Sequence, residues 1–118
     1  TSAAMPPIYH FEKKNNKVDE IQISNLPLGG LMTEDFTVLD KKFSKGDVIV
    51  MISDGLPEAP NKTGDLLDYE AVKKCVEKNS LKSAEEIKDE LVKLSDKWMN
   101  GIHNPDDITI VVCKKLKN

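Results

Sequence analysis

The chain has 118 residues, of which 39% are hydrophobic and 31% are charged, so it is too apolar for a disordered chain and long enough to bury one core. Its formal net charge is −3, with 17 basic and 20 acidic residues scattered along the sequence. This balance predicts no cationic face for a phosphate backbone, so we expect no nucleic-acid partner. No apolar run in the sequence is long enough to cross a bilayer, and residues 1–118 are expected to form a single, partial domain.

The N-terminal residues give an expectation for the cellular compartment. Thr1 to Pro7 lack the basic start and apolar stretch of a secretory signal, so the cytoplasm is the expected location, although a parent protein can be membrane-anchored through another domain.

Cys75 and Cys113 have apolar neighbours and no second Cys or His at metal-ligand spacing. Both are expected to be small hydrophobic residues of the core.

The first half of the chain has the pattern of an antiparallel sheet. A polar stretch at residues 13–17 is a natural hairpin connection between two apolar runs. Three short strands are expected here, namely Ile8–Phe11, Val18–Ile23 and Phe36–Phe43.

A fourth strand is expected at Val48–Ile52, which is apolar without interruption. That composition is typical of a central strand covered on both faces. A turn at residues 44–47 precedes it, and the sequence Ser53-Asp54-Gly55 ends it before a polar loop that contains Pro57 and Pro60.

Two helices are expected next. The first spans Tyr69–Lys78, with Asp68 as its N-cap. The second begins at Ser83, which forms a capping-box pattern with Glu86, and stops near Gly101. Its apolar face recurs at helical spacing, at Ile87, Leu91, Leu94 and Trp98.

The last expected element is a buried strand at Ile108–Cys113, rich in β-branched residues. If it returns antiparallel beside Val48–Ile52, the chain forms an α+β fold of antiparallel β-sheets with flanking helices.

Carboxylates lie next to both apolar strands. Burying a charge there costs free energy unless a positive or hydrogen-bonding group compensates it. Asp54 follows Val48–Ile52, and Asp106 and Asp107 precede Ile108–Cys113. In antiparallel neighbours, the end of one strand lies beside the start of the other, so these carboxylates are expected to converge at one rim. Such oxygens suit a hard divalent cation. Alternatively, Asp54 is only part of a turn, and the other two aspartates only cap backbone donors.

Five segments carry a family resemblance, and they occur in order across nearly the whole chain: Ala3–Tyr9, Leu26–Gly29, Lys45–Ala59, Asn61–Asp65 and Asp106–Thr109. The ordered set resembles the bacterial branch of the protein phosphatase 2C superfamily, typified by stage II sporulation protein E and the phosphatases that regulate sigma factors. The resemblance implies the C-terminal part of an α-β-β-α sandwich.

By this resemblance, Asp54 and Asp106 would be metal ligands, with Asp107 less often a direct one and Gly55 giving the backbone room beside the site. The complete domain would hold two Mn²⁺ or Mg²⁺ ions about 3.5–4 Å apart, which activate a water that attacks phosphorus. The catalyst would be this water, and no side chain would be the nucleophile.

The two histidines, His10 and His103, are expected at the surface or in loops, rather than as acid catalysts.

The sequence also departs from the family pattern. Relatives have Ala-Gly-His where this chain has Ala3-Ala4-Met5, and Phe-Gly where it has Leu67-Asp68. The acidic motifs of the family's N-terminal half do not occur, so we expect an incomplete fragment. Its partners would be the upstream half of the catalytic domain and a sensor domain. Open sheet edges would also offer pairing to a second copy, giving a homodimer.

The expected activity is hydrolysis of phosphoserine or phosphothreonine on a regulatory protein, by family analogy an anti-sigma-factor antagonist. One alternative is a catalytically inactive interaction module on the same scaffold. Another is a phosphoacceptor receiver domain, which is disfavoured because receivers alternate helices with strands.

Overall fold

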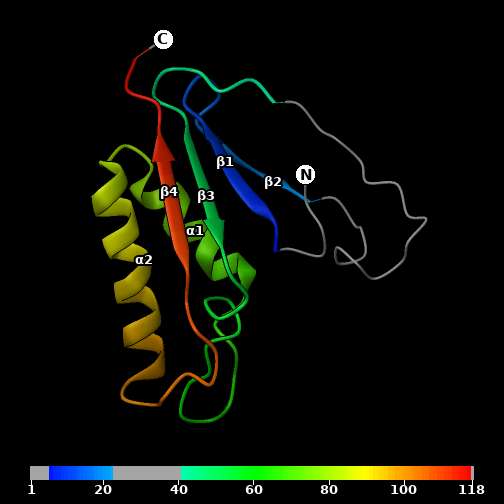
Figure 1. Ribbon diagram of the computed structural model, residues 1–118, viewed down its shortest axis with the longest axis vertical. Helices are drawn as coiled ribbons and strands as arrows, with labels where there is room; N and C mark the ends of the chain where they lie inside the picture. The colour runs from blue at the N-terminus through cyan, green and yellow to red at the C-terminus, as the bar shows by residue number, and fades with distance from the viewer. Residues whose placement is uncertain (1–5, 23–40, 118) are drawn as a thin grey trace, which may run out of the picture.

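The computed structural model describes residues 6–22 and 41–117 of the chain. The four strands of this part form one antiparallel sheet in the order β2-β1-β3-β4, which confirms the α+β class and excludes a receiver fold (Figure 1). Neither described helix is both long and apolar enough to span a membrane. The elements are β1 (Ile8–Glu12), β2 (Lys17–Ile21), β3 (Val48–Ile52), α1 (Tyr69–Asn79), α2 (Ala84–Met99) and β4 (Ile110–Lys114).

The first two strands form the predicted hairpin. In its register Phe11 faces Val18, and both side chains are buried. Asn16 has a φ of 52° in the connecting turn, a conformation that asparagine tolerates better than most residues. Of the third predicted strand, Phe36–Phe43, residues 36–40 lie outside the described part, and residues 41–43 are not strand.

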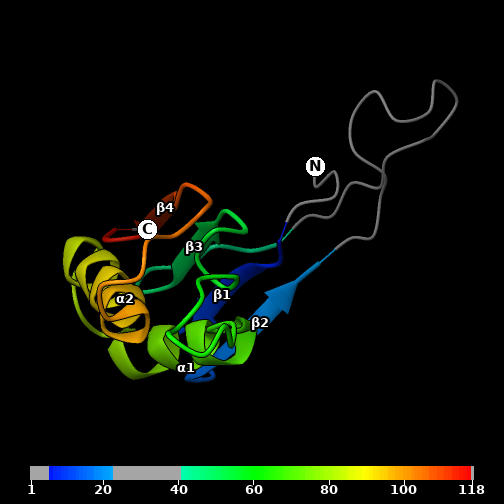
Figure 2. The same cartoon turned by 90° about the horizontal axis from the view of Figure 1, so that it is seen from below.

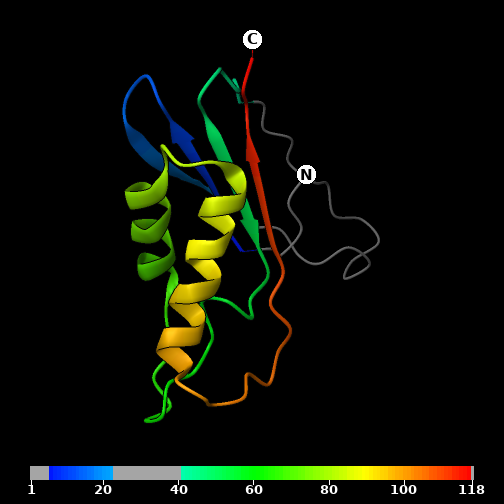
Figure 3. The same ribbon diagram turned by 90° about the vertical axis from the view of Figure 1, so that its left-hand side faces the viewer.

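The apolar strand β3 lies between β1 and β4, which confirms that it is central. Val48 and Val50 are fully buried, whereas Met51 on the opposite face is 41% exposed. The prediction that both faces are covered is therefore wrong for the described residues. The reason is that α1 and α2 lie on the same side of the sheet (Figures 2 and 3).

Both helices begin as the sequence predicts. The Asp68 carboxylate accepts a hydrogen bond from the Tyr69 amide at 2.7 Å, and Ser83 and Glu86 form a complete capping box. The helix α2 ends at Asn100, which takes the left-handed conformation with a φ of 48°. The helices cover the sheet with a buried apolar face that comprises Val72, Val76, Ile87 and Leu91.

The last strand, β4, is an edge strand with one open face. Val111 is 43% exposed and Cys113 is also exposed, while Ile110 and Val112 on the other face are partly buried against the core. A fully buried last strand was therefore a wrong prediction, as was a core position for Cys113. Cys75 is only half-buried.

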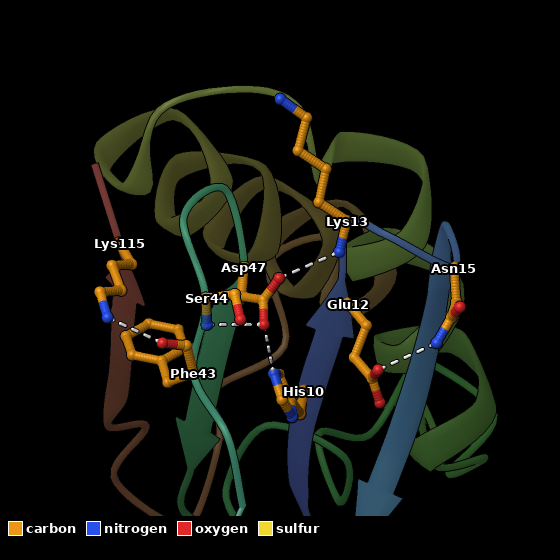
Figure 4. A network of polar contacts seen from close by, with 8 residues as sticks. All are labelled: His10, Glu12, Lys13, Asn15, Phe43, Ser44, Asp47 and Lys115. Atoms are coloured by element: carbon orange, nitrogen blue, oxygen red, sulfur yellow. Dashed lines mark hydrogen bonds and ion pairs between the residues drawn. The ribbon is translucent and has the colours of Figure 1, made fainter. Parts of the chain in front are cut away.

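The buried carboxylate of Asp47 connects several segments at one end of the sheet (Figure 4). This end is opposite to the loops that follow β3. Asp47 accepts hydrogen bonds from the Ser44 amide at 3.0 Å and the Lys13 amide at 3.1 Å, and its Oδ2 lies 3.1 Å from His10 Nε2.

The Phe43 ring packs edge-on to the His10 ring, with centroids 6.2 Å apart. His10 is only 2% exposed, so its predicted surface position is wrong. The Asp47 carboxylate offsets the burial of His10 Nε2, while Nδ1 has no hydrogen-bond partner within the described part of the chain.

The backbone around Asp47 also binds the end of β4. The Gly46 amide donates to the Lys115 carbonyl at 2.8 Å, and the Lys115 amide donates to the Asp47 carbonyl at 3.1 Å. One turn thus connects the β1–β2 hairpin, the start of β3 and the end of β4.

One residue in the loop before α1 is strained. Asp68 has a φ of 78° and a ψ of 157°, a combination that is essentially restricted to glycine and costs other residues about 1–3 kcal/mol. This is the position where the resembling family has the glycine of its Phe-Gly pair, so the structure gives a backbone reason for that glycine.

Replacing Asp47 by Asn should lower the free energy of unfolding by about 2–3 kcal/mol at neutral pH, because the amide nitrogen cannot accept the bonds that the carboxylate accepts. Burial opposes the charge of Asp47, but hydrogen bonds from Ser44, His10 and Lys13 outweigh it and hold its pKa below the ordinary 3.8. The carboxylate's contribution is therefore fully present above pH 3.8 and is lost as the pH falls through the lower folded-state pKa.

Urea unfolding of both proteins from neutral to acidic pH measures this difference. Asp19→Asn is the matched control, since Asp19 lies opposite His10 in the register with β2 but makes no bond to it in the described part. Equal stability of the wild type and Asp47→Asn at neutral pH would refute the role of the carboxylate.

Replacing Asp68 by Gly should raise the free energy of unfolding by about 1 kcal/mol, because relief of the strain outweighs the small loss of capping and the added chain entropy. Asp68→Ala keeps the strained backbone and loses the cap, so it should be destabilising. Thermal unfolding of the two variants tests the sign, and a Gly variant less stable than the wild type would contradict the strain.

Candidate functional site

The candidate carboxylate Asp54 lies in the turn that directly follows β3. Leu56 is fully buried and anchors the turn, while the Asp54 side chain remains exposed. The turn is closed by backbone bonds from the Leu56 amide to the Ser53 carbonyl at 3.3 Å and from the Glu58 amide to the Asp54 carbonyl at 3.0 Å. The backbone thus fixes the position of an aspartate that water can reach.

Ser53 connects this turn to the segment before β4. Its amide donates to the Thr109 carbonyl at 3.0 Å, and its hydroxyl accepts from the Thr109 amide at 2.9 Å. The same hydroxyl lies 3.3 Å from the Asp107 carbonyl, to which it donates. These bonds continue the pairing of β3 and β4 beyond both strands, and they bring the segments of Asp54 and Asp106–Asp107 to one end of the sheet, at the lower loops of Figure 1.

Asn104 adds a second connection that the sequence analysis missed. Its side-chain amide donates to the Gly55 carbonyl at 2.8 Å, and its side-chain oxygen accepts from the Asp106 amide at 3.0 Å. No local sequence pattern predicts the contact with Gly55, because it joins residues 49 positions apart in the chain.

Gly55 is buried where the two segments meet. A Cβ at this position would overlap the Asp107 carbonyl oxygen, so the close approach of the backbones requires glycine. We refer to the bonded segments 53–55 and 104–109 as the strand-end latch.

The latch carries three aspartates whose carboxylates are of the kind that could bind a divalent metal ion. Asp54, Asp106 and Asp107 are all exposed, and carboxylate oxygens are the ligands that Mn²⁺ and Mg²⁺ prefer. Within residues 6–22 and 41–117, no group of three or more His, Cys, Asp or Glu side chains is placed to hold a metal ion. Because such ions take about six ligands, the three aspartates alone would be too few for a complete shell. The ligand roles of Asp54, Asp106 and Asp107, and the supporting role of Gly55, remain predictions.

Negative charge gathers around the start of α1 beside this end of the sheet. Burial raises the pKa of the Tyr69 hydroxyl, and the charges of Asp54, Glu58 and Asp68 raise it further. A negative potential of this kind disfavours an anionic tyrosinate and favours a bound cation.

The loop between Asp54 and α1 is held against α2 by an indole. Trp98 Nε1 donates to the Ala59 carbonyl at 2.9 Å and to the Asp65 carbonyl at 3.1 Å. Inside the loop, the Asn61 side chain accepts from the amides of Thr63 and Asp65, at 3.0 and 2.9 Å. The sequence predicted Trp98 as an apolar residue of the helix face, and its hydrogen bonds to the loop depend on the fold.

The histidines take no part in the latch. His10 belongs to the Asp47 network, and His103 is exposed in the loop after α2, as predicted.

Comparison with known proteins gives consistent matches. Residues 1–115 match the family model described as "Stage II sporulation protein E (SpoIIE)". The chain is 30% identical over 118 residues to "Phosphoserine phosphatase RsbU" of Bacillus subtilis (strain 168), covering 97% of this chain and 33% of RsbU. It is 30% identical over 109 residues to "Stage II sporulation protein E" of Priestia megaterium, covering 92% of this chain and 18% of that protein.

Solved structures match over most of the chain. The PP2C phosphatase domain of SpoIIE from Bacillus subtilis, solved with a fragment of its regulatory domain, matches with a TM-score of 0.73 and 29% identity, over 94% of this chain and 32% of that one. The SiaA-PP2C domain of Pseudomonas aeruginosa matches with a TM-score of 0.78 over 94% of this chain and 43% of that one, and at 16% identity it supports the fold alone. The chain thus spans a third or less of these curated relatives and under half of these solved chains.

Replacing Gly55 by Ala should destabilise the protein by about 1–3 kcal/mol, because the methyl group forces the two segments of the latch apart. The Thr109 amide, which donates to Ser53, should exchange its hydrogen faster in the variant. Gly64→Ala is a useful comparison, since a Cβ there meets open space and only the φ of 85° is strained. Unchanged Thr109 exchange in Gly55→Ala would contradict the close approach.

Proposed function

Because the chain belongs to the stage II sporulation protein E (SpoIIE) family, we propose that it is the C-terminal part of the catalytic domain of a metal-dependent protein serine/threonine phosphatase. The observation that carries the proposal is the strand-end latch. It holds Asp54 and the Asp106–Asp107 segment at the same end of the adjacent strands β3 and β4. The printed names of the relatives, a phosphoserine phosphatase and PP2C phosphatase domains, support the same reaction class.

We propose Asp54 and Asp106 as ligands of Mn²⁺ or Mg²⁺, with Asp107 as a neighbouring carboxylate. A divalent ion at such a site supplies a water of lowered pKa and neutralises charge on phosphate oxygens. The residues of this chain orient the ligands: the turn after β3 fixes Asp54, and Asn104 fixes the Asp106 amide. One solved SpoIIE phosphatase domain is described as presoaked with Mn, and at 23% identity that match supports the fold alone.

The open face of the sheet is the place where we propose that the upstream half of the catalytic domain packs. This face carries Met51 and Val111, 41% and 43% exposed, and the exposed Cys113. Apolar side chains in a continuous row across two strands favour a second layer. That layer would also supply the acidic residues that complete the metal shell.

We propose a phosphorylated regulatory protein as the substrate, with an anti-sigma-factor antagonist as the specific candidate by family analogy. A sensor or regulatory domain in the parent protein would control the site. A homodimer is a second mode of assembly, through the edges of β2 and β4 that have no neighbouring strand within residues 6–22 and 41–117. The coverage of 33% of RsbU leaves room in such a parent for these additional parts.

In the complete catalytic domain, Asp54→Asn should reduce Mn²⁺-dependent hydrolysis of a phosphoserine protein by about 10²-fold or more, because a neutral amide is a poor ligand for a hard cation. The folding of the variant should be unchanged, since the Asp54 side chain is exposed. Asp96→Asn, an exposed aspartate on α2, is the matched control and should leave the rate unchanged. Normal turnover by Asp54→Asn would refute its assignment as a ligand.

Calorimetric titration with Mn²⁺ separates loss of catalysis from loss of the metal. We expect weaker Mn²⁺ binding in Asp54→Asn and Asp106→Asn and unchanged binding in Asp96→Asn. A complete domain that folds normally but neither binds Mn²⁺ nor hydrolyses phosphoserine would instead be the inactive interaction module.

A further inference from the structure

A groove of about 460 Å³ lies between the two helices. The view in Figure 3 has α1 and α2 side by side in front of the sheet. The apolar faces of the helices are buried in the core, whereas the four lysines that line the groove are exposed. The groove is lined by Ala71, Lys74, Cys75, Lys78, Asn79, Glu90, Lys93, Leu94 and Lys97.

The groove is strongly cationic in a chain that is acidic as a whole. It collects four of the 17 basic residues and only one of the 20 acidic ones, while the chain carries a net charge of −3. Lys93 lies 3.6 Å from Glu90, the single carboxylate of the groove. Within the described part of the chain, the amines of Lys74, Lys78 and Lys97 have no ion-pair partner. The sequence predicted no cationic face because the lysines are spread over residues 74–97, and packing of the two helices gathers them.

The floor of the groove is mostly apolar, and its buried polar residue, Asn79, donates a hydrogen bond to the Cys75 carbonyl at 2.8 Å. Ala71, Cys75 and Leu94 are partly buried against the core. Burial raises the pKa of the Cys75 thiol, so the thiol is neutral at physiological pH and behaves as a small hydrophobic group. An apolar strip between rows of lysines is complementary to an amphipathic helix whose apolar stripe is flanked by carboxylates.

A protein segment fits this surface better than a nucleic acid does. A polyanion gains from many phosphate contacts along an extended basic face, whereas this groove is short, contains Glu90 and belongs to an acidic chain. Its apolar floor adds binding free energy only for a ligand that has apolar side chains.

We propose that the groove between α1 and α2 binds an acidic amphipathic helix of a partner protein. The site is separate from the strand-end latch, since none of its lining residues belongs to segments 53–55 or 104–109. It would serve as a docking surface for a substrate or a regulator, independent of the metal-ligand role proposed for Asp54.

The test uses a synthetic amphipathic helix with a leucine stripe flanked by glutamates, and a scrambled peptide of the same composition. The helix should bind the protein with an affinity that falls as salt is added. The double variant Lys74→Glu/Lys93→Glu should weaken binding by about tenfold or more, since two attractions become repulsions. The control Lys17→Glu/Lys62→Glu makes the same charge change outside the groove and should leave the affinity unchanged.

Alkylation of the two cysteines shows where on the protein the helix binds. The bound helix should slow alkylation of the half-buried Cys75 in the groove floor, while the exposed Cys113 on β4 should react at the same rate as before. Absence of binding, equal binding of the scrambled peptide, or unchanged Cys75 alkylation would each overturn the proposal. Stronger binding of a single-stranded DNA of similar charge would overturn it in favour of a general polyanion site.

Discussion

The buried carboxylate of Asp47 is the constraint on which the rest of the sheet depends. It accepts hydrogen bonds from two backbone amides and from His10 Nε2, and its own backbone binds the end of β4. A charge at 4% exposure is tolerable only because these donors surround it. Through this one residue, the β1–β2 hairpin, β3 and β4 are fixed relative to each other at one end of the sheet.

The pairing of β3 and β4 also positions the segments at the opposite end of the sheet. Once β3 and β4 are paired in register, the bonds of Ser53 to Thr109 and Asp107 extend the pairing past both strands. Gly55 then permits the closest approach, and Asn104 closes the loop. The proposed metal ligands are exposed side chains on a rigid backbone, as expected where an ion must exchange with solvent while its ligands stay in place.

The two faces of the helix-sheet layer suit different partners. The apolar open face of the sheet would take a second protein layer, which the proposed phosphatase needs in order to complete its metal shell. The solvent side of the helices has a cationic groove with an apolar floor. Because the two surfaces lie on opposite sides of the layer, the proposed docking on the helices would not compete with the proposed assembly of the catalytic domain.

The sequence by itself determined the elements whose causes are local. The Ser83–Glu86 capping box, the Asp68 cap and the apolar run Val48–Ile52 involve neighbours in the chain, so the pattern specifies them. It also placed Asp54 and Asp106 next to two apolar runs, and the structure shows that the strands formed there are neighbours.

Only the tertiary structure decided which groups are buried and what they contact. His10 is buried because Asp47, 37 residues away, pairs with it, and Cys113 is exposed because it lies on the face of β4 opposite to the one that packs on the core. The lysines that line the groove are separated in sequence and meet through helix packing. Contacts between distant residues leave no local pattern, and they become visible only when the chain has folded.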